Sequence, residues 1–187
     1  NEPIQKDRSL EALSSGKGKK QPFVFRTNNE LYIDRSENIA DEFDLNFWIR
    51  GNGYEYRRID QMPASFMIVP LNFPGKPDVA DPYQALQYTT EQLKHWDMAP
   101  DNLAKLVAAG FQVALTGSDL KNKKDFQKNL SRSINRGLNE SDALAALTTN
   151  PAREFGQSKR LGKVAPGYIA NLVITDDNYF SVESTVN

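Results

Sequence analysis

The sequence of 187 residues contains no cysteine and a single histidine, His95. The absence of cysteine excludes disulfides, thiolate nucleophiles and thiolate metal sites. With one histidine, the chain alone cannot supply a histidine-rich zinc site, and a Ser-His-Asp triad could use only His95. His95 lies beside Trp96 between two predicted helices. A lone histidine in that setting is more typical of packing or of the surface than of catalysis.

The sequence also has little net charge and no long apolar run. A formal net charge of −1 gives no electrostatic reason to expect a nucleic acid or an anionic membrane as a partner. No apolar run approaches the roughly 20 residues that a membrane-spanning helix needs. We therefore expect a soluble protein, and nothing in the sequence indicates its compartment. The length is sufficient for one domain with a sizeable hydrophobic core.

Four short apolar runs, each typical of a buried strand, alternate with helical patterns. The strands are predicted at 22–25, 45–49, 65–69 and 111–116. This alternation indicates βα units and a parallel sheet, hence an α/β fold. Two architectures fit the pattern, an open doubly wound sheet or part of a (β/α)8 barrel. No GxGxxG sequence follows any of the strands, so a dinucleotide-binding fold has little support.

The helical segments differ in the strength of their apolar periodicity. In the first of them, Tyr32, Ser36, Ile39, Ala40 and Phe43 form the predicted apolar stripe. A long loop that is rich in proline and glycine is predicted between the third strand and the next helix. The helices are predicted up to about residue 43 and at 54–60, 84–96, 100–109 and 125–136, and the loop at 71–81.

Polar side chains follow the predicted strands at their carboxyl ends. In both candidate architectures, function is found at this edge of the sheet. The sequence therefore draws attention to a set of polar residues that directly follow the strands. They are Arg26, Thr27, Arg50, Asn52, Asn72, Thr116, Ser118 and Asp119.

The segment 137–175 has the clearest helix-boundary and turn signals in the chain. Asn139 is the predicted N-cap of a helix, with Asp142 at the spacing of a capping box. Asn150-Pro151 is predicted to open a second helix, with Asn150 as its cap. Pro166-Gly167 then sets a turn, and the alternation from 169 to 175 predicts a strand.

The same segment carries a family resemblance. GLNESDALAALTTNPAREFG, followed by LGKVAPGYIANLVITDDNYF, resembles the C-terminal signature of the amidohydrolase superfamily, and its imidazolonepropionase-like branch in particular. The preceding VALTGSD is similar to the last barrel strand of that family, which ends in Ser/Thr-Asp. The resemblance is strong from 96 to 180. From 22 to 70 it is carried by strand order and by the spacing of the strand ends.

The resemblance implies an eight-stranded TIM-like barrel flanked by a small β-sandwich. This chain would hold the last four barrel strands in residues 1–165, and residues 166–187 would return a strand to the sandwich and form a tail. Four strands cannot close a barrel, and two strand edges would be left unpaired. We therefore expect the N-terminal half of the barrel to come from a missing part of the protein or from another chain, and a homo-oligomer stays open.

The resemblance also implies a chemistry, the hydrolysis of non-peptide C–N bonds in a small-molecule substrate by metal-activated water. Asp119 matches the family's eighth-strand aspartate, which serves as general base or metal ligand. The family's fifth-strand and sixth-strand histidine positions align with Arg26 and with Arg50 or Gly51. An arginine cannot ligate a metal, because its guanidinium stays protonated. One divalent metal (Zn, Fe, Mn or Ni) is thus implied by the family but unsupported by this chain alone.

Two hypotheses for the arginines remain open at this point. Arg26, Arg50 and Asn72 could bind an anionic substrate, or the arginines could form strand-end ion pairs with Asp119 or Glu55. The metal site could be a reduced mononuclear site or a lost one. The alternative function is a non-catalytic, amidohydrolase-like module that holds a small anion or pairs with another subunit.

Overall fold

The computed structural model describes residues 7–8, 11, 21–62 and 65–186, so the start of the predicted region 1–165 lies mostly outside it. At its centre is a sheet of four parallel strands whose order follows the chain. The four predicted strands are confirmed to within two residues at either end. They are β1 (Pro22–Arg26), β2 (Asn46–Arg50), β3 (Phe66–Pro70) and β4 (Val113–Thr116).

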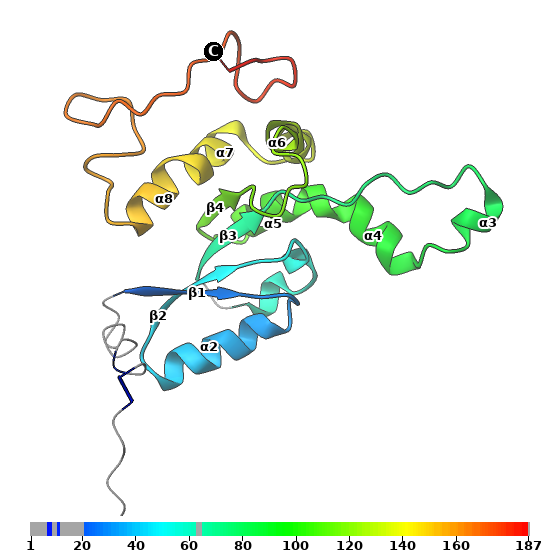
Figure 1. Cartoon of the computed structure of the whole chain (residues 1–187), viewed down its shortest axis with the longest axis horizontal. Helices are drawn as coiled ribbons and strands as arrows, with labels where there is room; N and C mark the ends of the chain where they lie inside the picture. Colours follow the sequence, from blue (N-terminus) through cyan, green and yellow to red (C-terminus); the bar gives the residue numbers. More distant parts are fainter. Residues whose placement is uncertain (1–6, 9–10, 12–20, 63–64, 187) are drawn as a thin grey trace, which may run out of the picture.

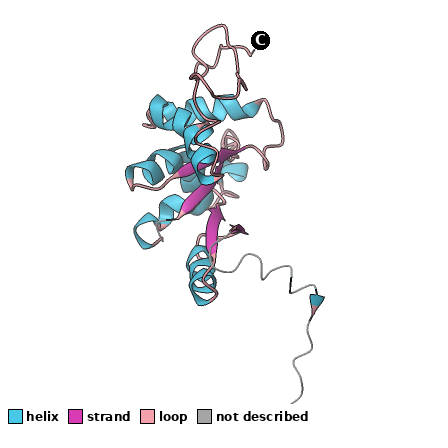
Figure 2. Ribbon diagram, turned by 90° about the vertical axis from the view of Figure 1, so that its left-hand side faces the viewer, coloured by secondary structure: helices cyan, strands magenta, loops and turns pink. Residues whose placement is uncertain are grey.

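The strand order decides between the two architectures. Each strand pairs with the strand before it, and the order never reverses as it does in a doubly wound sheet. Right-handed crossovers in such a sheet place the helices on one face, as in a (β/α)8 barrel. Figure 2 shows most of the helices on one side of the strands. The α/β fold therefore fits part of a barrel, with β1 and β4 as the edges of the described sheet.

The helices lie close to their predicted positions. One predicted helix, at 84–96, is instead two helices, because Thr89 starts a new helix with a capping box to Gln92. The predicted helix at 54–60 is two short 3-10 turns, η1 (Glu55–Arg57) and η2 (Ile59–Gln61). A further 3-10 turn, η3 (Ala99–Asp101), precedes α5. The α-helices are α2 (Tyr32–Glu42), α3 (Pro82–Ala85), α4 (Thr90–Met98), α5 (Asn102–Ala108), α6 (Asp125–Asn135), α7 (Glu140–Leu147) and α8 (Thr149–Glu154).

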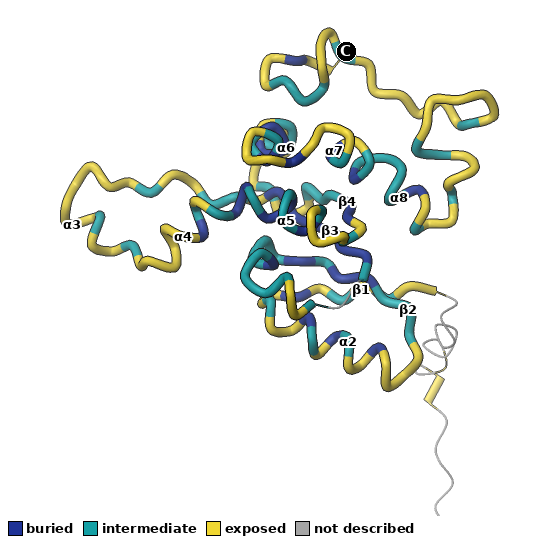
Figure 3. The backbone as a smooth tube through the Cα atoms, turned by 180° about the vertical axis from the view of Figure 1, so that it is seen from behind, coloured by how far each residue is buried: buried dark blue, intermediate teal, exposed yellow. Residues whose placement is uncertain are grey.

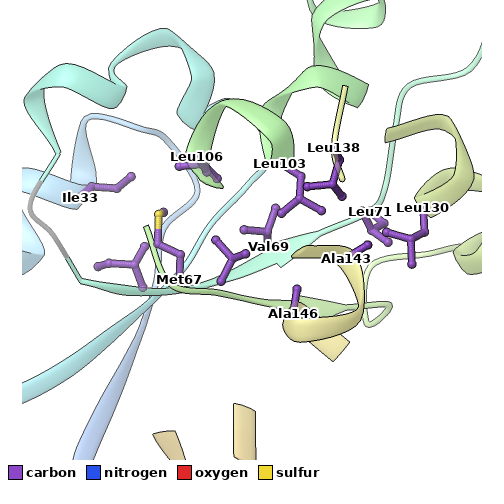
Figure 4. Close-up of a cluster of buried hydrophobic side chains, with 12 residues drawn as sticks. Ile33, Met67, Val69, Leu71, Leu103, Leu106, Leu130, Leu138, Ala143 and Ala146 are labelled. Atoms are coloured by element: carbon purple, nitrogen blue, oxygen red, sulfur yellow. The ribbon is translucent and has the colours of Figure 1, made fainter. Parts of the chain in front are cut away.

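The main hydrophobic core lies between the sheet and the helices. Met67 and Val69 of β3 meet Leu103 and Leu106 of α5 there, and all four are almost fully buried (Figure 4). The predicted stripe of α2 is only partly correct: Ser36 and Ala40 are buried with Ile33, whereas Tyr32, Ile39 and Phe43 are about half exposed. Their exposure follows from the position of α2 beside β1 and β2 at one edge of the sheet (Figure 1), where few elements cover it.

The opposite face of the sheet carries a second, smaller apolar cluster. Trp48, Phe66 and Ala114 are buried there, and the Trp48 ring packs edge-on against Phe66 and Phe155, at centroid distances of 5.2 and 5.0 Å. Val24 lies level with Trp48 in the strand register but is 52% exposed. This face is the one that would line the interior of a complete barrel.

Two segments extend from the body of the molecule. The predicted loop 71–81 is confirmed, and together with α3 it forms an arm that projects beyond α4 and is largely exposed (Figures 1 and 3). The C-terminal segment after α8 is also mainly exposed (Figure 3).

The helix boundaries and the turn predicted within 137–175 are partly confirmed. Asn139 is the N-cap of α7, but its amide nitrogen donates to Asp142 Oδ2 (3.2 Å) and no side-chain cap bond forms. Asn150 lies inside α8, and its amide nitrogen donates to the carbonyl of Val113 in β4 (3.0 Å). Gly167 takes a positive φ of 86° in the predicted turn.

The strand predicted at 169–175 does not form. Residues 169–174 have no regular structure, and Thr175 makes an isolated antiparallel bridge with Val186. A strand needs a neighbour to satisfy its backbone groups, and no described strand lies beside this segment. Val173 and Ile174 are accordingly well exposed, at 69% and 63%. The expected return to a β-sandwich is not confirmed, and the division at residue 166 stays a prediction.

Candidate functional site

The structure brings together three of the predicted strand-end residues. Arg26 and Arg50 are the last residues of β1 and β2 and are direct partners in the parallel register. Asp119 follows β4 by three residues. Because side chains alternate along a strand, Arg50 lies on the same face as Trp48, opposite the main core. The cluster therefore sits at the carboxyl edge of the face that would line a barrel.

Asp119 bridges the two arginines. Its Oδ2 accepts from Arg50 Nη2 at 2.5 Å, and its Oδ1 lies 3.6 Å from Arg26 Nη2. Arg50 Nη2 also donates to Ser118 Oγ (2.6 Å). Thr116 Oγ1 in turn accepts from the Ser118 backbone N–H (3.2 Å). The ion-pair hypothesis is thus correct with Asp119 as the partner, and Glu55 has a different role that is described below.

The two arginines differ in exposure and in the number of groups that hold them. The Arg50 side chain is 15% exposed, and its guanidinium is held by Asp119 and Ser118. The Arg26 side chain is 63% exposed and makes one long ion pair. The ends of the two strands are joined by Thr27, whose N–H and Oγ1 both donate to the Arg50 carbonyl (3.0 and 3.2 Å). The Arg26 side chain is therefore largely accessible, whereas the Arg50 guanidinium is held in place.

Asn72 and Asn52 do not join the cluster. Asn72 is exposed at the start of the arm, and within the described chain no hydrogen bond links it to either arginine or to Asp119. Asn52 belongs to the turn after β2, where its Oδ1 accepts from the Tyr54 N–H (3.0 Å).

The residues that the structure describes do not fit a metal site. Across residues 21–62 and 65–186, no group of three or more histidine, aspartate or glutamate side chains could hold a metal ion. Both oxygens of Asp119 face guanidinium groups, whose charge opposes the approach of a cation. We accordingly derive no step through a metal.

The turn that follows Arg50 contains a buried carboxylate that the sequence did not single out as a site. Glu55 is completely buried and accepts hydrogen bonds from the backbone N–H groups of Asn52 and Gly53 and from Asn102 Nδ2. A Cβ at Gly51 would overlap this carboxylate and lie 2.7 Å from its Cδ, so a larger residue there would have to displace it. The pair of glycines around Asn52, two residues before an acid, is the one sequence signal that marks this turn.

His95 packs against this turn. Its ring stacks on Tyr54 with centroids 3.6 Å apart, and its Nδ1 lies 3.3 Å from the hydroxyl of Tyr56. Burial, and then the positive charge of Arg57, lower the pKa of His95 below its ordinary value. The structure thus places His95 in packing, one of the two settings that the sequence favoured over catalysis.

Comparisons with known proteins give one family match and one similar fold. Residues 100–187 match the model of the Amidohydrolase family. The matched segment covers a little less than half of the chain. It contains β4, Asp119 and the segment 137–175, whereas Arg26 and Arg50 lie outside it. A search of curated proteins finds no match.

The fold of the whole chain is similar to a solved structure, the crystal structure of an amidohydrolase from Thermotoga maritima. The TM-score is 0.74 at 24% sequence identity, and the similarity covers 100% of this chain but 46% of that one. The amidohydrolase-like chain thus spans less than half the length of this structural neighbour. No helix in the part that the structure describes is long and apolar enough to cross a membrane.

Proposed function

We propose that this chain is part of an amidohydrolase that hydrolyses a non-peptide C–N bond in a small-molecule substrate, with Asp119 as general base. The family match at 100–187 supports the hydrolase class. The observation that carries the proposal is the position of Asp119 between Arg26 and Arg50 at the carboxyl ends of the strands. In barrel enzymes this edge holds the catalytic groups.

The two oxygens of Asp119 are not equivalent. Oδ2 is held by Arg50, whereas Oδ1 has only the 3.6 Å contact with Arg26. Oδ1 is therefore the oxygen that can accept a proton from water. The water oxygen attacks the carbon of the substrate, the C–N bond breaks, and the proton passes to the leaving nitrogen. Arg50 holds the carboxylate in place through this contact.

Arg26 is the substrate-binding arginine in this proposal. Its guanidinium is exposed and has five N–H donors, a geometry that matches a carboxylate or phosphate. Asn72 is a further candidate contact, since it follows β3 at the same edge of the sheet. These assignments favour an anionic substrate.

The rest of the barrel would come from a missing part of the protein or from another chain. The strands β1 and β4 each have one paired side in the described sheet, and the structural neighbour is more than twice as long. Any divalent metal (Zn, Fe, Mn or Ni) would need its ligands mainly from that other half, because Asp119 is the one matching acid here.

The test is Asp119→Asn in the protein in its natural sequence context, assayed for amine or ammonia release from cyclic amides and N-acyl amino acids. We expect the release to fall by at least about 10³-fold with an unchanged circular dichroism spectrum, because the amide cannot accept the proton. Asp78→Asn, on the exposed arm, is the matched control. Unchanged hydrolysis in Asp119→Asn would remove Asp119 from the mechanism.

A second measurement addresses the alternative of a non-catalytic module that holds a small anion, which the comparisons do not favour. Binding of small carboxylates to the wild type and to Arg26→Gln is compared by calorimetry. Carboxylate binding that depends on Arg26, in a protein that hydrolyses none of the substrates, would replace the hydrolase proposal by this alternative.

A further inference from the structure

The turn after Arg50 is folded around the buried carboxylate of Glu55. Oε1 accepts from the N–H of Asn52 (2.5 Å) and from that of Gly53 (3.1 Å), and Oε2 accepts from Asn102 Nδ2 (2.7 Å). No cation is paired with this carboxylate in the described residues. A completely buried carboxylate without a cation is costly unless neutral donors satisfy it, as they do here. Such a group is seldom incidental to the fold.

The two hydrogen bonds of the Asn102 side chain each have a fixed donor and a fixed acceptor. The Tyr56 N–H donates to Asn102 Oδ1 (2.7 Å), and the Asn102 Nδ2 group donates to Glu55 Oε2. The side chain of Asn102 can serve both neighbours only in this orientation. If residue 55 carried an amide, its NH2 group would face either the NH2 group of Asn102 or the N–H groups of Asn52 and Gly53. Rotating Asn102 would set its own NH2 group against the Tyr56 N–H. The arrangement therefore requires an acceptor at 55 opposite an amide at 102.

This network ties the turn to the body of the protein. Asn102 is the first residue of α5, whose Leu103 and Leu106 are buried in the main core. Gly51, directly after Arg50, leaves no room for a Cβ beside the Glu55 carboxylate. The backbone on both sides of Arg50 is thus fixed, by Thr27 before the turn and by Glu55 within it.

We propose that Glu55 and Asn102 are positioning residues for the ionic cluster: they hold the turn 51–53 on the core, and so fix the Arg50 guanidinium on Asp119 and Ser118. The proposal rests on the proposed function in giving Arg50 and Asp119 a role in the site. The arginine itself has a flexible side chain. Its guanidinium can hold Asp119 in one orientation only if the strand end that carries it does not move.

The experiment compares Glu55→Gln with the double variant Glu55→Gln/Asn102→Asp. In the single variant every orientation of the two amides leaves one donor facing another donor. In the double variant the new amide at position 55 donates to the new carboxylate at position 102, which also accepts from the Tyr56 N–H. We expect hydrogen exchange of the Asn52 and Gly53 amides to be about tenfold faster in the single variant, and to return toward wild type in the double variant. Hydrogen exchange at the Arg50 guanidinium, followed by nitrogen-15 NMR, is expected to change in the same way.

Two controls separate positioning from stability. Ile33→Val removes one methylene group from the core away from the turn. When it is compared with Glu55→Gln under conditions in which the two variants are equally stable, it should leave hydrogen exchange at the Arg50 guanidinium unchanged. Glu91→Gln removes an exposed carboxylate near η1 that contacts Arg57 and does not touch the turn. The readouts need no catalysis, so they stand or fall separately from the hydrolase proposal.

The outcomes divide as follows. Faster Arg50 exchange in Glu55→Gln, reversed in the double variant, supports positioning even if no hydrolysis is found. Arg50 exchange at the wild-type rate in Glu55→Gln overturns it, even in an active hydrolase. If Glu55→Gln does not fold, the double variant decides: wild-type exchange at the turn supports the proposal, and fast exchange or failure to fold overturns it.

Discussion

Two carboxylates make contacts at the carboxyl end of β2, Asp119 with Arg50 and Glu55 with the turn that follows, and they are held by opposite means. Asp119 is partly exposed and is held by the charges of two arginines. Glu55 is completely buried and is held by neutral N–H groups. An exposed ion pair is weakened by water and salt, whereas a buried carboxylate loses much more when a donor is misplaced. The comparison indicates that Glu55 contributes more to the stability of the fold than Asp119 does.

Gly51→Ala is the most disruptive change that this comparison predicts. The new Cβ would overlap the Glu55 carboxylate, 2.7 Å from its Cδ, and would displace it from its donors. We expect the free energy of unfolding to fall by about 3 kcal/mol, measured by urea denaturation. Gly75→Ala, where a Cβ meets nothing within 4 Å, is the control. Equal stability of the two variants would show that the turn can rearrange freely around Glu55.

A smaller effect is expected from pH, through His95 behind the same turn. Burial lowers the pKa of His95 below the value of about 6.5 in the unfolded chain. The stability gained from neutral His95 is therefore complete above about pH 6.5, and is lost as the pH falls through the folded pKa. Urea midpoints between pH 7.5 and 5.5 should decline in the wild type and less steeply in His95→Gln. Parallel declines would assign the pH dependence to other groups.

The smallest effect is expected for the ion pair between Arg50 and Asp119. A double-mutant cycle with Arg50→Gln and Asp119→Asn should give a coupling free energy of about 0.5–1 kcal/mol at low salt. It should decrease in 0.5 M NaCl, because partly exposed charges are screened. The cycle with Glu55→Gln and Asn102→Asp should not respond to salt. A salt-independent Arg50–Asp119 coupling would mean that the cluster is shielded from solvent.

The parts of the molecule that depend on short stretches of sequence could be predicted from it. The buried strands, and the meeting of Arg26, Arg50 and Asp119, follow from apolar runs and from the rule that parallel strands end at one edge. The break at Thr89 was not predicted, because a capping box competes there with a continuous helical pattern.

The parts that depend on distant partners could not be predicted. Glu55 and Asn102 are 47 residues apart, and nothing local indicates that they meet. The segment 169–175 shows the converse, since its alternation is typical of a strand but no described strand lies beside it. Asn150 likewise has the sequence of a helix cap, yet it binds the backbone of β4.

The attachment of the C-terminal loop to α6 has a practical consequence for handling the protein. Gln127 Nε2 lies within 3.1 Å of the carbonyl oxygens of Tyr179, Ser181 and Ser184, and Ser131 Oγ donates to the Phe180 carbonyl (2.5 Å). Trimming the chain at residue 174 would expose these groups on the helix that follows Asp119. Shortened versions of the protein should therefore keep residues 175–186.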